Sequence, residues 1–123
     1  MSICLSAGAA AAVLLVETFT LAWTHSIEKI RWEEDWRIEN GALVISAARI
    51  RGIGAGMEPP PGSVLKNGIW HYRPALPPQT RLRLAHSPYA AAYELCGDGH
   101  CAPLTTYLPG VANDTVIDIK PCV

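Results

Sequence analysis

Apolar and polar residues alternate with a period of two over most of the chain. Residues 30–38 show the pattern most clearly, and only Glu34 interrupts their apolar face. That face comprises Ile30, Trp32, Trp36 and Ile38. The opposite, charged face comprises Arg31, Glu33, Asp35 and Arg37. Such alternation is typical of a strand that buries one face.

Two Asn-Gly pairs predict tight turns. Asn40-Gly41 supplies the two positive φ angles of a type I′ turn, so residues 31–39 and 42–51 should form a hairpin. Asn67-Gly68 predicts a second turn that leads into a strand over residues 69–73.

The remaining pattern indicates short strands separated by loops. Further strands are expected over residues 80–85, 89–96 and 115–120, and the glycines and prolines of residues 52–63 predict a long surface loop. Outside the N-terminal alanines, no stretch of ten residues carries a helical apolar stripe. We therefore predict an all-β fold, an antiparallel sandwich or partly open barrel of seven or eight short strands, with residues 1–123 as one domain.

The N-terminal segment allows two interpretations. Residues 3–16 form an uncharged run, too short for a bilayer-spanning helix and without the basic start of a signal peptide. They are either a degenerate signal or anchor, or two core strands joined near Gly8. We favour the strands, because residues 19–24 continue directly as a strand. Membrane contact is expected at most through residues 3–16.

Charge excludes one class of partner. The 123 residues carry a formal net charge of −1, and 17% of them are charged. This composition lacks the basic surface that nucleic-acid binding requires, so no nucleic-acid partner is expected.

Four cysteines are present, and two of them enclose a short loop. Four residues separate Cys96 from Cys101, a spacing that suits a hairpin with the two sulfurs facing each other at its base. We favour a disulfide here over free thiols. A metal site that uses Cys96, His100 and Cys101 is less favoured, because zinc takes four ligands and the usual paired spacings are missing.

The segment His25-Ser26-Ile27-Glu28 follows an apolar strand and is the first candidate site. Polar residues at a strand end commonly build binding sites. Glu33, Glu34 and Asp35 lie on the next strand and could pair with the polar residues of this segment. The plain alternative is a strand end with a solvated Glu28 and a His25 that caps backbone groups.

Other familiar motifs are missing. The run Gly52–Met57 precedes three prolines, so no helix follows it to hold a phosphate. There is no Gly-x-Ser-x-Gly elbow, and no catalytic residue, metal or cofactor is assigned. The four tryptophans are expected to pack in the core or at its edge.

Three segments together resemble a bacterial family, domain of unknown function 1850. They are residues 19–28, the pair Glu33-Glu34, and the loop Gly54-Ala55-Gly56-Met57. The similarity runs from about Phe19 to the C-terminal strand. It implies a periplasmic or envelope location and a helper role beside TAXI-class tripartite ATP-independent periplasmic transporters. Because residues 3–16 do not have the pattern of a clear signal peptide, a cytoplasmic location stays open.

These observations favour a non-enzymatic accessory or binding domain that works with a solute transporter. Its expected partner is a transporter subunit or solute-binding protein. The expected binding residues are His25, Ser26, Glu28, Glu34, Gly54 and Gly56. One alternative is a small metal-binding or hydrolytic protein centred on His25, Glu28 and Glu34. Another is a structural module that pairs through an exposed strand.

Overall fold

The computed structural model describes residues 1–24, 30–51, 60–85, 93–112 and 114–122. The described residues form eleven strands and one short helix. The first five strands are β1 (Ser2–Ala7), β2 (Ala10–Leu14), β3 (Thr18–Thr24), β4 (Arg31–Glu39) and β5 (Ala42–Arg51). They are followed by β6 (Val64–Lys66), β7 (Ile69–Tyr72), β8 (Leu82–Ala85), β9 (Glu94–Gly97), β10 (His100–Pro103), α1 (Leu104–Tyr107) and β11 (Val116–Cys122).

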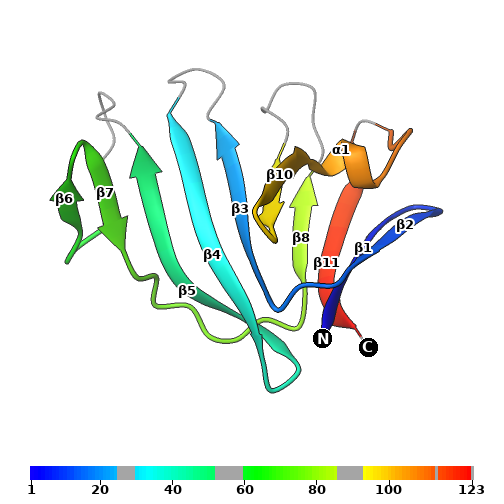
Figure 1. Ribbon diagram of the computed structural model, residues 1–123, viewed down its shortest axis with the longest axis horizontal. Coiled ribbons are helices and arrows are strands. Elements are labelled where there is room, and N and C mark those ends of the chain that lie inside the picture. The colour runs from blue at the N-terminus through cyan, green and yellow to red at the C-terminus, as the bar shows by residue number, and fades with distance from the viewer. Residues whose placement is uncertain (25–29, 52–59, 86–92, 113, 123) are drawn as a thin grey trace.

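The strands form two antiparallel sheets, which confirms the predicted all-β sandwich. The larger sheet has the order β10-β9-β3-β4-β5-β7-β6, and the smaller has the order β2-β1-β11-β8. In Figure 1 the large sheet runs from β6 at the left to β9 and β10, and the small sheet stands at the right. The strand count is higher than the predicted seven or eight, because short pieces such as β6 and β10 pair as separate strands.

The core lies between the two sheets. Each sheet contributes the alternating inward side chains of its strands, as expected for strands with one buried face. Ile3, Leu5, Ile117 and Ile119 come from the small sheet, and all are 0–1% exposed. Phe19, Leu21, Trp36, Leu43, Ile45 and Leu95 come from the large sheet. Trp36 thus has the predicted core position.

The N-terminal segment is part of the sandwich. β1 pairs with β2 on one side and with the C-terminal strand β11 on the other. A disulfide joins Cys4 to Cys122 across the β1–β11 pair, so the two ends of the chain are linked covalently. The interpretation of residues 3–16 as two core strands agrees with this arrangement.

The first predicted hairpin has the predicted bounds. Asn40 and Gly41 adopt φ angles of 52° and 75°, as a type I′ turn requires. Asn67 and Gly68 form the second predicted turn, also with positive φ. A one-residue bulge interrupts the β4–β5 pairing, because Asp35 faces Ala47 while Trp36 faces Ile45.

The helix α1 is an addition to the predicted all-strand pattern. It makes a single turn after β10 and buries Leu104 in the core. Among the residues that the structure describes, no helix is long and apolar enough to span a bilayer.

Candidate functional site

Three consecutive acidic residues of β4 point to opposite faces of the large sheet. Glu33 and Asp35 lie on one face, and Glu34 lies on the other, as the alternation predicted. We call the face that carries Glu33 the polar face and the face that carries Glu34 the aromatic face. The two faces differ in how their carboxylates are compensated.

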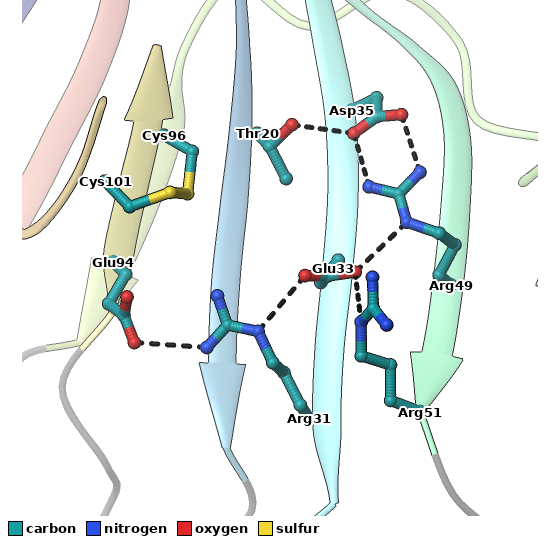
Figure 2. The surroundings of a disulfide bond; sticks show 9 residues. All are labelled: Thr20, Arg31, Glu33, Asp35, Arg49, Arg51, Glu94, Cys96 and Cys101. Carbon is teal, nitrogen blue, oxygen red and sulfur yellow. Dashed lines mark hydrogen bonds and ion pairs between the residues drawn. A yellow bond between two sulfur atoms is a disulfide. The ribbon is translucent and has the colours of Figure 1, made fainter. Parts of the chain in front are cut away.

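On the polar face, Glu33 is surrounded by three arginines (Figure 2). Its Oε2 accepts a hydrogen bond from Nε of Arg31 at 3.1 Å. Its Oε1 accepts from Nε of Arg49 at 3.1 Å and from Nε of Arg51 at 2.8 Å. Burial alone would raise the pKa of Glu33, but the hydrogen bonds from the three arginines outweigh it and lower that pKa.

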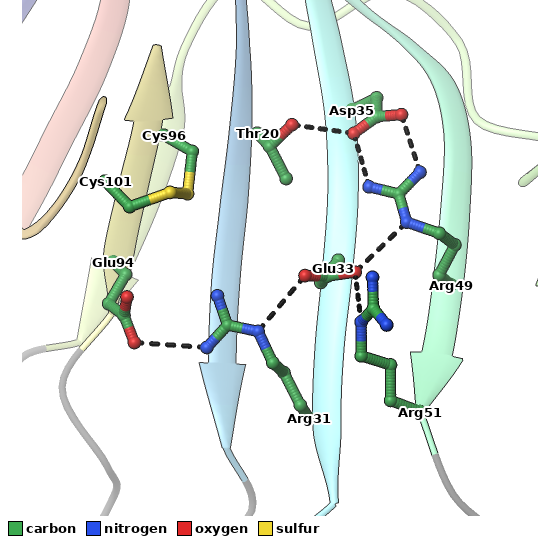
Figure 3. A network of polar contacts seen from close by, with 9 residues as sticks. All are labelled: Thr20, Arg31, Glu33, Asp35, Arg49, Arg51, Glu94, Cys96 and Cys101. Atoms are coloured by element: carbon green, nitrogen blue, oxygen red, sulfur yellow. Dashed lines mark hydrogen bonds and ion pairs between the residues drawn. A yellow bond between two sulfur atoms is a disulfide. The ribbon is translucent and has the colours of Figure 1, made fainter. Parts of the chain in front are cut away.

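A small residue lets this network cross a strand. Ala22 on β3 stands opposite both Glu33 and Glu94, and its methyl group is fully buried. Over it, the Arg31 guanidinium extends from β4 to β9, where its Nη1 donates to Glu94 Oε1 at 3.1 Å (Figure 3). A longer side chain at position 22 would occupy the path of Arg31.

Asp35 extends the network with a two-pronged ion pair. Arg49 donates from Nη1 to Oδ2 at 2.7 Å and from Nη2 to Oδ1 at 2.8 Å. The Thr20 hydroxyl also donates to Oδ1 at 2.8 Å. The Arg49 hydrogen bond lowers the pKa of Asp35 despite the opposing effect of burial, and it raises the pKa of Arg49.

The predicted hairpin disulfide borders the same face. Cys96 and Cys101 are cross-strand partners on β9 and β10 and are bonded to each other, with Cα atoms 4.0 Å apart. A depression of about 690 Å³ lies between this hairpin and the Asp35–Arg49 pair, and His100 also lines it. Asp35 and Arg49, which line this depression, are already paired with each other. Asp98 also lines it and takes part in no described salt bridge.

The aromatic face has a different composition. Three half-buried tryptophans lie in one row across it, because Trp23 faces Trp32, Trp32 faces Ile50, and Ile50 faces Trp70. The rings of Trp23 and Trp32 are stacked, with centroids 6.2 Å apart and planes 11° from parallel. The ring of Tyr93 packs against Trp23 at 5.5 Å with a 52° tilt.

Glu34 lies in the next row of this face. Its neighbours across the strands are Leu21 and Ala48, and Tyr72 stands beyond Ala48 on β7. Among the residues that the structure describes, one donor reaches Glu34: Nε1 of Trp36 donates to its Oε1 at 3.3 Å. In the described part of β3, β4, β5 and β7, Glu34 is the only charged residue on this face, and no described salt bridge includes it.

The position of Glu34 changes several acidities. Burial raises its pKa, and the hydrogen bond from Trp36 opposes the shift only in part. Burial, together with the negative charge of Glu34, also raises the phenol pKa values of Tyr72 and Tyr93. A half-buried carboxylate with a raised pKa among aromatic rings is a common feature of binding and catalytic sites.

Of the predicted binding residues, only Glu34 is described. His25, Ser26, Glu28, Gly54 and Gly56 lie outside the described residues, so their predicted roles stay predictions. The strands that border them end together, because Thr24 pairs with Arg31 and Arg31 pairs with Arg51. The segments 25–29 and 52–59 therefore both follow strands that end at the same side of the sheet, next to the tryptophan row.

The structure adds residues that the sequence analysis did not assign. Arg31 was predicted only to lie on the charged face of its strand, and no role was predicted for Arg49, Arg51 or the Cys4–Cys122 pair. The tryptophans were predicted to pack, yet Trp23, Trp32 and Trp70 are half-buried on one face. The available signal was a spacing of two residues, between Trp32 and Glu34 and between Trp70 and Tyr72. Among the described residues, no group of three or more potential ligands could hold a metal ion.

The two disulfides indicate an oxidising compartment outside the cytoplasm. A family model described as "Domain of unknown function (DUF1850)" matches residues 19–104. That range extends from the second residue of β3 to the end of β10, and therefore includes both faces of the large sheet. No curated protein and no solved structure matches the chain.

Proposed function

Because the chain belongs to the DUF1850 family, we propose that it is a non-enzymatic binding domain that assists a TAXI-class solute transporter in the periplasm. Its binding surface is the part of the aromatic face that carries Trp23, Trp32 and Glu34. Further along the same face, Phe19, Trp36 and Leu43 belong to the core between the sheets. In this role the domain binds a small solute there and associates with the solute-binding protein of the transporter.

One observation carries this proposal. The aromatic face combines stacked, half-buried indole rings with the carboxylate of Glu34, which has no ion-pair partner among the described residues. Small-molecule sites in proteins combine apolar and aromatic walls with a few polar groups that fix orientation. The large polar network of the opposite face does not offer this combination, because its charges are already paired.

Two further observations support the location and the partner. The disulfides suit an oxidising compartment, and the periplasm is such a compartment. The resemblance to the family, carried by residues 19–28 and Glu33-Glu34, implies a helper role beside TAXI-class transporters. This neighbourhood is an association and not a mechanism, so a direct binding measurement is needed.

Binding and association are tested separately. A panel of amino acids, dicarboxylates, sugars and amines is screened for compounds that raise the melting temperature of the protein. We expect at least one compound to stabilise the wild type and to lose its effect in Trp32→Ala. The matched control is Glu39→Gln, because Glu39 lies at the far, exposed end of the same strand. Compounds that stabilise Trp32→Ala equally would contradict the aromatic face as the binding surface.

Association is measured by immobilising the protein and presenting the solute-binding protein of the transporter encoded beside it. We expect specific capture, with the solute-binding protein of an unrelated transporter as the control. No capture, in the presence or absence of a stabilising solute, would rule out the accessory role.

Two alternatives are decided by simple measurements. Metal analysis of the purified protein, with and without chelator, tests a metal or hydrolytic centre that uses Glu34 with His25 and Glu28. Light scattering tests a structural module that pairs through an edge strand such as β2, where Val13 is 60% exposed.

A further inference from the structure

The charge distribution over the large sheet points to the class of ligand. Three arginines of β4 and β5, Arg31, Arg49 and Arg51, bind Glu33 on the polar face. The remaining arginine of β4, Arg37, pairs with Glu39. The aromatic face therefore has a negative group and no described cation to compensate it. A ligand that brings a positive charge gains from this arrangement, whereas an anionic ligand would be repelled by Glu34.

The aromatic rings favour a particular kind of positive charge. Tryptophan and tyrosine rings attract cations over their faces, most strongly when the cation is weakly hydrated, as an alkylated ammonium group is. Trp23 and Trp32 stand parallel, and Tyr93 is tilted by 52° against Trp23, so the three rings present faces in two directions. This arrangement suits the rounded shape of an ammonium group that carries alkyl substituents.

An inorganic cation fits this surface poorly. Calcium and magnesium require about six oxygen ligands, and zinc requires four nitrogen, sulfur or oxygen ligands. The described residues of the aromatic face supply one carboxylate, and no metal-binding group is present among the residues that were searched. Ala48 adds to the contrast, because its small side chain between Glu34 and Tyr72 leaves the carboxylate flanked by a methyl group and not by a second ligand.

We propose that Trp23, Trp32 and Tyr93, together with Glu34, bind the alkylated ammonium group of a small organic cation. This inference rests on the proposed function and names the ligand class of its binding surface. The rings hold the alkyl groups and the charge over their faces, and the Glu34 carboxylate neutralises the charge. Trp36 positions that carboxylate through its indole N–H and does not itself contact the ligand.

The probe for the test is choline, compared with 3,3-dimethylbutan-1-ol, which has the same shape without the charge. Binding is followed through the indole N–H signals of the ¹⁵N-labelled protein, which report on each of the four tryptophans. We expect choline to shift the signals of Trp23 and Trp32. The neutral compound should bind at least tenfold more weakly.

The variants separate charge from fold. Glu34→Gln keeps the shape and the acceptor for Trp36 but removes the charge, and should weaken choline binding at least tenfold. Glu39→Gln, on the same strand, should leave it unchanged. Equal binding of choline and its neutral analogue, or an unchanged affinity in Glu34→Gln, would overturn the proposed ligand class. If choline fails to bind while an uncharged or anionic compound stabilises the wild type but not Trp32→Ala, the ammonium inference is wrong and the proposed binding domain stands. If no compound stabilises the wild type in this way, the ammonium inference and the proposed binding function are both wrong.

Discussion

Glu33 and Glu34 are neighbours in the chain and carry the same side chain, yet the fold places them in opposite environments. Glu33 is only 11% exposed and accepts hydrogen bonds from three arginines, and its pKa is lowered. Glu34 accepts one hydrogen bond from an indole, and its pKa is raised. The comparison teaches that the charge of a carboxylate can stabilise a fold on one face of a strand and remain available for a ligand on the other.

The same comparison explains why alanines stand at positions 22 and 48, beside the two glutamates. Ala22 on the polar face allows Arg31 to cross β3 and reach Glu94. Ala48 on the aromatic face separates Glu34 from Tyr72. On the polar face, the side chain of Arg31 passes over Ala22 and forms an ion pair with Glu94. On the aromatic face the neighbours of the alanine are a carboxylate and a phenol, and neither is a cation.

The largest expected effect is a loss of stability when Glu33 on the polar face is neutralised. Glu33→Gln leaves three guanidinium groups without their shared carboxylate in a mostly buried position, which should cost about 3 kcal/mol of unfolding free energy. Urea unfolding at pH 7 measures the change. Glu39→Gln removes a carboxylate that is 49% exposed, and should cost less than about 1 kcal/mol. A loss of similar size in both variants would mean that the arginine network contributes little.

The second effect concerns the disulfide at the border of the polar face. The double variant Cys96→Ser with Cys101→Ser opens a loop of six residues, and chain entropy predicts a loss of about 2 kcal/mol. Choline binding at the aromatic face should be unchanged, because the bridge lies on the opposite side of the sheet. Thermal unfolding and the indole N–H titration measure the two properties on the same samples. A loss of choline binding at constant stability would show that the two faces are coupled.

The smallest expected effect is a gain in stability, and it tests the environment of Glu34 on the aromatic face. Because the pKa of Glu34 is raised in the folded protein, the unfolded chain releases this proton first as the pH rises. Its ionisation therefore lowers stability from the ordinary carboxylate range upward, through the raised pKa. Glu34→Gln lacks this loss and should be more stable than the wild type at pH 7, by less than about 1 kcal/mol because the side chain is still partly exposed to solvent.

For Glu33, ionisation has the opposite effect on stability. The pH dependence of the two glutamine variants therefore provides a control. Glu33 has a lowered pKa, and its stabilisation is present above the ordinary carboxylate pKa and lost as the pH falls through the lowered value. Urea unfolding from pH 7 to pH 3 should therefore bring Glu34→Gln and Glu33→Gln closer to the wild type from opposite sides. A Glu34→Gln protein that is less stable than the wild type at pH 7 would contradict an uncompensated carboxylate.

Local features of the sequence determined much of this protein. The alternation in residues 30–38 assigned each acidic residue to its face, and Asn40-Gly41 set the hairpin bounds, because a two-residue turn needs two positive φ angles. The six-residue segment from Cys96 to Cys101 predicted its own disulfide, since both sulfurs belong to one hairpin. In each case the interacting groups are close in sequence, and backbone geometry alone brings them together.

Tertiary structure decided the partners. An uninterrupted hairpin from Asn40-Gly41 would place Glu33 opposite Ala48, and only the bulge after Asp35 brings Arg49 opposite Glu33. Cys4 and Cys122 meet because β1 and β11 are neighbours in the small sheet, across 118 residues of chain. The row of Trp23, Trp32 and Trp70 likewise depends on the strand order β3-β4-β5-β7. A period of two fixes the face on which a side chain lies, but strand order and register, which depend on packing across the whole sandwich, choose its neighbours.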